Sequence, residues 1–404
     1  MRAKAILLCA FLFTSAISAV AGTYKELHAF DFNNTAYSPY AGVVFDSAGN
    51  LYGVAAYGGG DYTDGAIFEL TPSGNGWTYT DRFKFDFYYD TYGRNPMGGV
   101  ALDESNNVYA TTSYGNSDWA THCGTVFSLS AGTVIHNFRG PDGCDPEANL
   151  HYFNGRLWGT TRSGGAKGQG TVFSMDINGD SFQFDSFCGN GRDPSGGINI
   201  WGYGVTNSGG ATAKGNVYKY KLDPKRQLIN KFNFTLNGKA GYAPKGDVLA
   251  VYVGGVRKMY GTTSAGGTGG GGTVYQLTEL APNSDRWQIS VLHSFRSNSE
   301  KGWSPMAGLT VDAKGNLYGT TERGGIFSDI WNGDCGTVFK LSPGKGGKWT
   351  HRVLHSFDLN WQNESFEGCD PHSGVVLDSA GNLYGTTLAG GSNNMGGTVY
   401  EIVP

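Results

Sequence analysis

Acid–base residues of this sequence concentrate in long, varied loops that precede a GTVF-like segment or contain a recurring proline. His122 and His372 lie in two such loops, and Asp370 stands two residues before His372. Imidazole and carboxylate groups exchange protons near neutral pH, so these three are the catalytic candidates, as a general base or, with Tyr and Arg, in a lyase-like site. Four other histidines share one repeated position and are predicted to be structural: His28, His136, His293 and His355.

The same loops carry further carboxylates and cations. Paired carboxylates could act in glycoside hydrolysis, where one donates a proton and the other assists the attack. Their spacing along the sequence does not fix their separation in space, however, and a solvated loop face is the simpler interpretation. These residues are Arg139, Asp142, Asp145, Glu147, Arg192, Asp193, Arg323, Asp329, Asp334, Glu364, Glu367 and Asp370.

Aromatic and cationic side chains of these loops favour ligand binding. Four of the nine tryptophans fall in them. Exposed aromatic rings can stack on sugar rings or on protein side chains; the alternative is that they cover the rim of a channel or pack against each other. The predicted ligand-binding residues are Trp119, Arg139, Arg192, Trp303, Arg323, Trp331 and Trp361.

The sequence contains no motif for several other kinds of site. It contains no HExxH zinc motif, no GxSxG nucleophile motif, and no glycine-rich loop followed by Lys and Ser or Thr. Acidic turns such as DSAGN at Asp46 have one carboxylate each, too few for calcium. The net charge of −4 leaves no basic footprint for a nucleic acid. No metal, cofactor or nucleic-acid partner is therefore expected.

The loops belong to a repeated unit. The hexapeptide NLYGTT at 316–321 returns at 382–387, and degraded copies begin at Asn50, Asn107, Arg156, Gly202 and Lys258. A glycine-rich gap and a GTVF-like segment follow each copy. One unit reads as four short runs, here called strands A to D, at 308–312, 316–321, 336–341 and 349–357. Seven such meanders, with a period of about 55 residues, predict an all-β, seven-bladed β-propeller.

The order of the strands predicts how the ring closes. A lone D strand at 24–30 precedes the first unit, and the last unit ends with strand C at 397–402. We expect the N-terminal strand to complete the last blade, because this pairing joins the ends and protects an exposed edge. Residues 22–404 are then one propeller domain of seven repeats, expected to be a monomer.

Two loops repeat together with their chemistry. The A–B turn reads DSAGN or a variant of it at Asp46, Asp103, Asp312 and Asp378, where Asp can accept bonds from backbone donors ahead of it. The D–A loop contains a proline in every unit, and in five units a glycine follows three residues later. The prolines are Pro39, Pro96, Pro146, Pro194, Pro244, Pro305 and Pro371.

The cysteines predict two disulfides. Cys123 and Cys335 each precede a GTVF segment directly, and Cys144 and Cys369 lie in the GCDP sequences of the next D–A loops. In a meander, the B–C and D–A loops share one face of the blade, so we expect Cys123–Cys144 and Cys335–Cys369 bonds. A zinc site is the alternative, but no CxxC spacing occurs. Cys188 remains, as a buried thiol or an intermolecular linker.

The first 21 residues have the organisation of a secretory signal peptide. Arg2 and Lys4 precede an apolar run, and Ala19-Val20-Ala21 forms a small-residue cleavage site. A membrane anchor is the alternative, although the run is short, and no later stretch is apolar enough to span a membrane. A secreted, extracellular protein is predicted, with the periplasm or the cell surface as other locations.

The repeat is similar to that of a known family. The segments GNLYGTT…GGTVY at 381–400, GNLYGTT…GTVFKL at 315–341 and VLHSF…P…G at 353–374 resemble the GloVer tandem repeat of secreted bacterial proteins, also called choice-of-anchor repeat proteins. The resemblance extends over essentially the whole mature chain. It implies a secreted, β-propeller-like protein without a transferable activity. Members often end in an anchoring segment that this sequence does not show, so free secretion is expected.

These observations lead to two functional hypotheses. The first is an extracellular binding propeller for a glycan or a protein, which uses the loops that carry tryptophan. The second is a polysaccharide-active enzyme, a lyase or a glycoside hydrolase, with its site in the central funnel. A cluster of His, Tyr and Arg, or two carboxylates, at the channel mouth would favour the enzyme, whereas a flat aromatic surface would favour binding. A structural component of the cell envelope is a third option.

Overall fold

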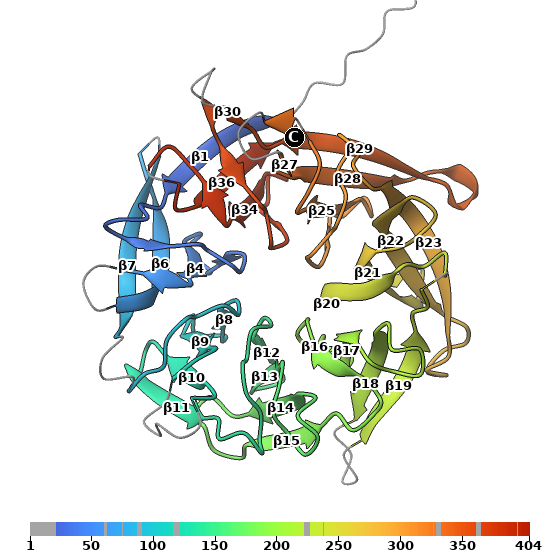
Figure 1. The fold of residues 1–404 in the computed structure, drawn as a ribbon, viewed down its shortest axis with the longest axis horizontal. Helices are drawn as coiled ribbons and strands as arrows, with labels where there is room; N and C mark the ends of the chain where they lie inside the picture. Colours follow the sequence, from blue (N-terminus) through green and yellow to red (C-terminus); the bar gives the residue numbers. More distant parts are fainter. Residues whose placement is uncertain are drawn as a thin grey trace, which may run out of the picture.

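Seven four-stranded antiparallel sheets stand around a central axis and form a closed ring (Figure 1). The computed structural model describes residues 22–59, 63–74, 76–86, 91–115, 122–221, 227–236, 238–325, 327–328, 333–360, 365–393 and 395–404. In each sheet the strands follow the order A, B, C, D, with strand A nearest the axis. The predicted seven-bladed β-propeller is confirmed.

The first four blades follow one another along the chain. Blade 1 contains β3 (Val44–Phe45), β4 (Leu51–Ala55), β6 (Thr63–Ser73) and β7 (Gly76–Asp86). Blade 2 contains β8 (Ala101–Leu102), β9 (Val108–Thr112), β10 (Thr125–Ser128) and β11 (Thr133–Asn137). Blade 3 contains β12 (His151–Phe153), β13 (Arg156–Thr161), β14 (Thr171–Met175) and β15 (Gln183–Ser186). Blade 4 contains β16 (Arg192–Pro194), β17 (Tyr203–Ser208), β18 (Asn216–Lys221) and β19 (Gln227–Asn233).

The remaining blades include the two with the clearest repeat. Blade 5 contains β20 (Tyr242–Val253), β21 (Val256–Ala265), β22 (Gly270–Glu279) and β23 (Trp287–Arg296). Blade 6 contains β24 (Thr310–Val311), β25 (Leu317–Thr321), β28 (Thr337–Pro343) and β29 (Trp349–Ser356), with the short helix η1 (Lys345–Gly347) in its C–D turn. Blade 7 contains β33 (Val376–Leu377), β34 (Leu383–Thr387), β36 (Thr398–Val403) and β1 (Thr23–Ala29).

Four two-stranded ladders lie in the loops outside the blades. They are β2 (Ala36–Tyr37) with β5 (Tyr57–Gly58), β26 (Phe327–Ser328) with β27 (Gly333–Asp334), β30 (Leu359–Asn360) with β31 (Ser365–Phe366), and β32 (Gly368–Cys369) with β35 (Ala389–Gly390). Among the described residues, no helix has the length and the apolar character needed to cross a membrane.

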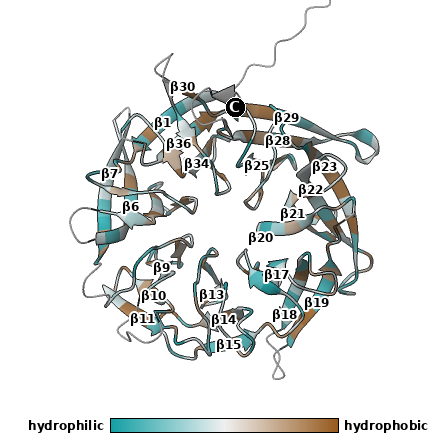
Figure 2. Ribbon diagram, viewed as in Figure 1, coloured by the Kyte–Doolittle hydropathy of each residue, from teal (hydrophilic) through white to brown (hydrophobic). Residues whose placement is uncertain are grey.

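Strand β1 closes the ring as the sequence predicts. It pairs antiparallel with β36, and Thr23 lies opposite Val403. The pairing gives blade 7 its outermost strand and leaves no open edge between the first and last blades. The side-chain core is divided between blades rather than centred: one cluster joins Tyr384 and Val399 of blade 7 to Leu51 and Phe68 of blade 1. Figure 2 accordingly shows hydrophobic stretches distributed around the whole ring.

The first residues of NLYGTT hold the A–B turn. In blade 6, Oδ1 of Asp312 accepts hydrogen bonds from the backbone N–H groups of Lys314 (2.9 Å) and Asn316 (2.8 Å). Its Oδ2 accepts from Asn316 Nδ2 (2.7 Å) and from the Tyr318 hydroxyl (3.1 Å). A short side chain that bonds its own backbone ahead favours a tight turn. The carboxylate of the acidic turn therefore accepts its hydrogen bonds from the protein itself, as the turn interpretation predicted.

The glycine of NLYGTT makes room for the aromatic residue of strand C. A Cβ atom at Gly159 would lie 2.4 Å from Cζ of Phe173, which is closer than packed carbon atoms can come. The same conflict would arise in five other blades, where a Phe or Tyr ring covers the equivalent glycine. In blade 2 the position is Ala110, opposite Phe127. The glycine is thus a packing requirement of the blade.

The two threonines of NLYGTT connect strands and blades. The first donates its hydroxyl to a carbonyl of the next blade: Thr320 to Ser373 (2.7 Å) in blade 7, and Thr386 to Ala41 (2.9 Å) across the closure to blade 1. The second meets the threonine of GTVF within the blade, as Thr321 meets Thr337 at 2.8 Å. Both interactions bury hydroxyl groups with partners, so they cost little desolvation.

Contacts between a proline and a glycine join neighbouring blades at the loop face. A Cβ atom at Gly170, directly before strand C of blade 3, would lie 2.7 Å from Cδ of Pro194 and 2.3 Å from the carbonyl oxygen of Thr161. Every blade repeats this contact, including Gly397 with Pro39 across the closure. All seven prolines are buried. We call these seven contacts the proline–glycine seam.

The four histidines of strand D stack on aromatic rings of the next blade. The centroids of His28 and Tyr79 are 3.8 Å apart, and those of His136 and Phe182 are 3.7 Å apart. His293 stacks on His351 at 4.3 Å, and His355 stacks on Tyr24 at 4.8 Å. Burial holds the pKa of His28 and of His293 at about 4, so both are neutral at neutral pH. These contacts support the predicted structural role.

Both predicted disulfides are present. Cys123 bonds Cys144, and Cys335 bonds Cys369, at sequence separations of 21 and 34. Each bond links the residue before the seam glycine of strand C to the D–A loop that leads to the next seam proline. Cys188 is exposed, so the interpretation as a buried thiol is wrong. Its loop leaves the last strand of blade 3 at the surface and offers no apolar cover.

Candidate functional site

A cavity of about 460 Å³ opens on the axis of the ring, on the face that carries the D–A and B–C loops. Every blade contributes the segment that leads into its strand A. The lining residues are 40–44, 97, 99–100, 147–151, 193–195, 245–247, 306–310 and 372–376, with Asn207 from strand B of blade 4 and Arg162 directly after strand B of blade 3. A cavity thus lies at the loop face, where the sequence predicts a site in a central funnel.

The seam sets the direction of each lining segment. The residue before every seam proline has a left-handed backbone, with φ between 54° and 57°, from Ser38 in blade 1 to Asp370 in blade 7. Most of these residues are Ser, Asn or Asp, which tolerate this conformation better than larger residues do. The buried proline then fixes the next φ angle. The residue after the proline is thereby placed on the rim of the cavity.

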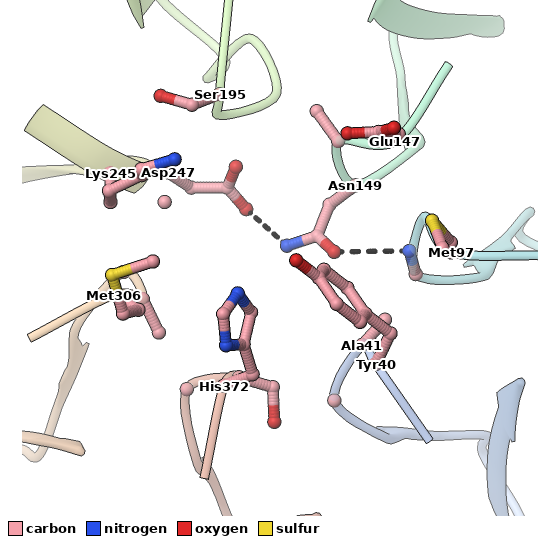
Figure 3. A pocket seen from close by; sticks show the side chains of 18 of the residues that line it. Tyr40, Ala41, Met97, Glu147, Asn149, Ser195, Lys245, Asp247, Met306 and His372 are labelled. Atoms are coloured by element: carbon pink, nitrogen blue, oxygen red, sulfur yellow. Dashed lines mark hydrogen bonds between the residues drawn. The ribbon is translucent and has the colours of Figure 1, made fainter. Parts of the chain in front are cut away.

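Seven side chains occupy this position, one from each blade, and we call them the channel ring. All seven are half-buried and line the cavity (Figure 3). Six residue types occur among them, although the proline before each one never changes. A phenol, two thioethers, a carboxylate, a hydroxyl, an ammonium and an imidazole meet around one opening. The members are Tyr40, Met97, Glu147, Ser195, Lys245, Met306 and His372.

Two members of the channel ring form an aromatic contact across the closure. The ring centroids of Tyr40 and His372 are 4.4 Å apart, with the planes inclined at 47°. Burial lowers the pKa of His372 below 6.5, against the opposing effect of Glu322, and Lys245 lowers it further. Burial also raises the pKa of the Tyr40 phenol above 10. At neutral pH the pair is therefore a neutral imidazole beside a neutral phenol.

The charged members of the ring are partly dehydrated. Burial lowers the pKa of Lys245, and burial raises the pKa of Glu147 although Arg162 opposes that change. Arg162 donates from Nη1 to both carboxylate oxygens of Glu147 (3.2 and 3.3 Å) and from Nε to Asp193 (3.1 Å). Asn207 extends this chain by donating to Asp193 at 2.8 Å. One side of the opening thus carries a connected polar edge.

A second polar group crosses the cavity more deeply. Asn149 Nδ2 donates to Oδ2 of Asp247 at 2.8 Å (Figure 3). Nε2 of His151 lies 3.0 Å from the same oxygen, and the backbone N–H of Gly197 donates to Oδ1 at 2.6 Å. Blades 3, 4 and 5 are therefore joined by one carboxylate. We call Asn149, His151 and Asp247 the channel floor.

Opposite charges in the channel floor stabilise each other. Burial lowers the pKa of His151, but the Asp247 carboxylate raises it by more, so the pKa lies above 6.5. Burial raises the pKa of Asp247, but His151 and the hydrogen bonds of Asn149 and Gly197 lower it by more, so it lies below 3.8. Both groups remain in contact with the cavity.

The channel floor was missed by the sequence analysis, although a signal for it exists. A glycine follows the seam proline by three residues in five blades. Asn149 and Asp247 occupy that position in the other two blades. At this position the other five blades have no side chain, so a polar side chain there indicates a specific role. The hydrogen bond between Asn149 and Asp247 provides that role.

Three of the predicted site residues come together at blades 6 and 7. Trp303 and Arg323 exchange backbone hydrogen bonds of 2.8 and 3.1 Å. Nη1 of Arg323 lies 3.5 Å from Oδ1 of Asp370. The indole of Trp303 is half-buried and donates to Asp334 at 2.7 Å. Burial raises the pKa of Asp370, and Arg323 opposes this shift.

The other predicted site residues lie apart from this group. Arg139 and Arg192 are exposed on blades 2 and 4, where Arg192 donates from Nε to the hydroxyl of Ser208 (3.2 Å). His122 lies on blade 2 and stacks on Tyr114 with centroids 5.6 Å apart. Of the catalytic candidates, His372 is the one that lines the cavity. Trp119, Trp331 and Trp361 lie outside the described residues.

Comparisons with known proteins identify the repeat and the fold. The model of the Gloeobacter/Verrucomicrobia repeat matches residues 12–199 and again 200–404. These matches confirm the resemblance drawn from NLYGTT, GTVF and VLHSF. A comparison with curated protein sequences finds no match.

Several solved structures share the architecture. The extracellular domain of a putative hybrid two-component system from B. thetaiotaomicron has a TM-score of 0.52 and 11% identity, over 94% of this chain and 39% of that chain. The extracellular domain of a putative one-component system from the same organism has a TM-score of 0.53 and 11% identity, over 94% and 40%. This chain thus spans less than half the length of these two. A chain of the mitotic checkpoint complex has a TM-score of 0.51 and 11% identity, over 100% and 99%. At these identities the likeness shows the fold alone.

Proposed function

We propose that the chain, which belongs to the Gloeobacter/Verrucomicrobia repeat family, is a secreted binding propeller that takes a glycan at the channel ring. The observation that carries the proposal is the contrast between neighbouring positions of the repeat. The seam proline is the same in all seven blades, whereas the residue after it has six identities and faces the cavity. A repeat keeps what the fold needs and varies what a ligand selects.

The chemistry of the channel ring suits a sugar. Tyr40 offers an aromatic face for the apolar side of a sugar ring, and Glu147, Ser195, Lys245 and His372 offer donors and acceptors for its hydroxyls. The cavity has the size of small-ligand sites, which measure roughly 300–1,000 Å³. A protein ligand would need about 800 Å² of surface on each partner, so it would contact the loop face beyond this opening.

Three observations support secretion. The first 21 residues read as a cleavable signal peptide, so the mature chain would begin at Gly22. Two disulfides fit an oxidising compartment. Two propellers of similar fold are described as extracellular domains. We propose an extracellular, monomeric protein on these grounds.

Retention of the purified protein on a panel of immobilised polysaccharides tests the binding function. We expect at least one glycan to retain the wild type, and Tyr40→Ala and His372→Ala to weaken retention. Tyr252→Ala is the matched control, because Tyr252 is 65% exposed near the A–B hairpin of blade 5, on the opposite face. Retention by no glycan, or equal retention of wild type and both ring variants, would contradict the proposal.

The contact between Tyr40 and His372 favours a second candidate, a polysaccharide lyase acting on uronic-acid chains. Neutral His372 would remove the proton at C5 of a uronate. The electrons of that C–H bond would form the C4–C5 double bond as the C4–O bond breaks, and Tyr40 would protonate the leaving oxygen. Lys245 would neutralise charge on the carboxylate. Both residues would recover their protonation states by exchange with water.

Ultraviolet absorbance of the unsaturated product tests this candidate. Wild type incubated with polygalacturonate or alginate should produce it, whereas His372→Ala and Tyr40→Phe should not. Retention of the chains without any new absorbance would leave the binding function and remove the enzymatic one.

A further inference from the structure

An outer set of residue pairs surrounds the channel ring, and in blades 1 and 2 the strand-B member of the pair is a tyrosine. In each blade the residue two before the seam proline faces a residue at the end of strand B. Blade 1 has Tyr37 opposite Tyr57, and blade 2 has Arg94 opposite Tyr114. At the position of the two tyrosines, the other blades carry Ser163, Ser208, Ala265, Arg323 and Ala389.

The aromatic rings of blade 1 form a stack that reaches the surface. The centroids of Phe32 and Tyr37 are 4.4 Å apart, and those of Tyr37 and Tyr57 are 5.8 Å apart, with the planes inclined at 38° and 34°. Phe32 is 57% exposed. A large aromatic ring that is more than half exposed marks a surface for contact.

Local hydrogen bonds hold this stack in place without a ligand. Oδ1 of Asp31 accepts from the backbone N–H of Asn33 at 2.9 Å, and its Oδ2 accepts from Asn34 Nδ2 at 2.6 Å. The Asp31 N–H donates to the hydroxyl of Thr35 at 2.9 Å. The turn that presents Phe32 is therefore built before binding, which lowers the entropy lost when a ligand binds.

The stack continues into blade 2 through charged groups. The Asp64 carboxylate lies 3.9 Å from Nη1 of Arg94 and accepts from Asn95 Nδ2 at 3.1 Å. The guanidinium carbon of Arg94 lies 4.7 Å above the Tyr114 ring. Tyr114 is 43% exposed and stacks nearly parallel to His122. We call Phe32, Tyr37, Tyr57, Arg94, Tyr114 and His122 the aromatic band.

The aromatic band also lies close to the channel ring. Tyr37 lies three residues before Tyr40 of the channel ring, and Arg94 lies three residues before Met97. The backbone N–H of Ala56, next to Tyr57, donates to the carbonyl of Ser38 at 3.1 Å. A ligand held at the channel ring can therefore continue onto the band.

From this arrangement we infer that the aromatic band binds the internal residues of a linear polysaccharide, whose end occupies the channel ring. The inference rests on the proposed glycan-binding function. Successive flat rings interrupted by Asp64 and Arg94 match a chain of sugars, which presents apolar ring faces and hydroxyl edges in turn. At the strand-B position, blades 3, 4, 5 and 7 carry serine or alanine. The rings of Tyr242 and Trp303, which face this position in blades 5 and 6, are half-buried. Phe32 and Tyr114 are exposed instead, so the chain would leave the opening over blades 1 and 2.

The dependence of affinity on chain length tests this inference. The probes are the disaccharides and hexasaccharides of β-1,4-glucan, β-1,4-xylan and polygalacturonate, measured by isothermal titration calorimetry. For the series that binds, the wild type should bind the hexasaccharide about tenfold more tightly than the disaccharide, since two further stacking contacts add about this factor. Tyr57→Ala/Tyr114→Ala should reduce this ratio to near one and leave disaccharide affinity unchanged.

Two further variants separate the explanations. Tyr57→Phe/Tyr114→Phe retains both rings and should retain the ratio, which excludes a role of the hydroxyls, and unchanged disaccharide affinity of the alanine variant excludes a folding defect. Tyr40→Ala should weaken both lengths by the same factor. Disaccharide binding without a length dependence would overturn the inference and leave the proposed function standing, whereas a wild type that binds neither length of any series would overturn both.

Discussion

The proline–glycine seam and the channel ring are adjacent in the chain and opposite in character. At the seam, all seven blades use the same two residue types, because a buried proline ring fits only where strand C begins with a glycine. One residue later, the chain presents Tyr, Met, Glu, Ser, Lys, Met and His to one cavity. The difference shows that one position of the repeat serves the fold and the next position serves the cavity. The seam places a side chain, and the chemistry of that side chain remains free to vary.

The largest effect is expected from a change that breaks the seam. Gly170→Ala places a methyl group against the Thr161 carbonyl and Pro194 in a left-handed backbone (φ 92°). The backbone strain and the overpacking together should cost about 3–5 kcal/mol of unfolding free energy. Gly168→Ala is the matched control, because it shares the positive φ (66°) but would meet no atom within 4 Å. Urea unfolding that gives the two variants equal stability would contradict this account.

Removing a disulfide should weaken the seam nearly as much. The bonds close loops of 21 and 34 residues, and chain entropy assigns them about 3.3 and 3.8 kcal/mol. Cys335→Ala/Cys369→Ala should therefore lower unfolding stability slightly more than Cys123→Ala/Cys144→Ala. Denaturant unfolding of the wild-type protein with and without reductant provides the reference. A double variant as stable as the oxidised wild type would show that the bond adds no stability.

The channel floor should contribute less, with a defined pH dependence. Asp247→Asn removes the carboxylate that raises the pKa of His151, and should cost about 1 kcal/mol. The raised pKa of His151 adds stability that is complete below its ordinary pKa of 6.5. This stability is lost as pH rises through the higher pKa that His151 has in the folded protein. The lowered pKa of Asp247 adds stability that is present above 3.8 and is lost as pH falls. The gap to wild type should therefore be widest between 3.8 and 6.5.

Two measurements check that prediction. Urea unfolding at about pH 5.5 and about pH 8.5 should show a smaller gap at the higher pH. NMR titration of His151 should give a lower pKa in Asp247→Asn than in the wild type. A gap that stays constant while the His151 pKa falls would mean that the charge pair contributes nothing to folding.

The smallest effect on stability is expected within the channel ring. Lys245→Met keeps most of the aliphatic side chain and removes an ammonium group whose pKa is already lowered by burial. Unfolding free energy should change by less than about 0.5 kcal/mol. Glycan retention should nevertheless change, because a donor leaves the cavity. A large loss of stability here would erase the contrast between ring and seam.

The fold could be predicted from the sequence because its rules are local and repeated. Asp312 accepts hydrogen bonds from the backbone of its own turn. Gly159 leaves space for the ring of Phe173, and Thr321 forms a hydrogen bond with Thr337 on the adjacent strand. Each relation recurs often enough in the sequence to be recognised without coordinates. The disulfides followed for the same reason, since two units place a cysteine before GTVF and another in the next loop.

The site could be predicted only as a region. Tyr40 and His372 meet because the ring closes, and no pattern along the chain relates one to the other. The aromatic residues predicted to bind ligand are all tryptophans, whereas the rings of the aromatic band belong to Phe32, three tyrosines and His122. Comparing the residue after each seam proline across the units would have found the channel ring, and the exceptions Asn149 and Asp247 would have indicated its floor.

The pairing of β1 with β36 has a consequence for the order in which the molecule assembles. The hydrogen bond from Thr386 to Ala41 spans 345 residues, and the strand that completes blade 7 comes from the opposite end of the chain. Contacts of such long sequence separation form slowly. During that time β1 is an unpaired strand that can join a strand of another chain. We therefore expect ring closure to be a slow step of folding, during which β1 is exposed to competition from strands of other molecules.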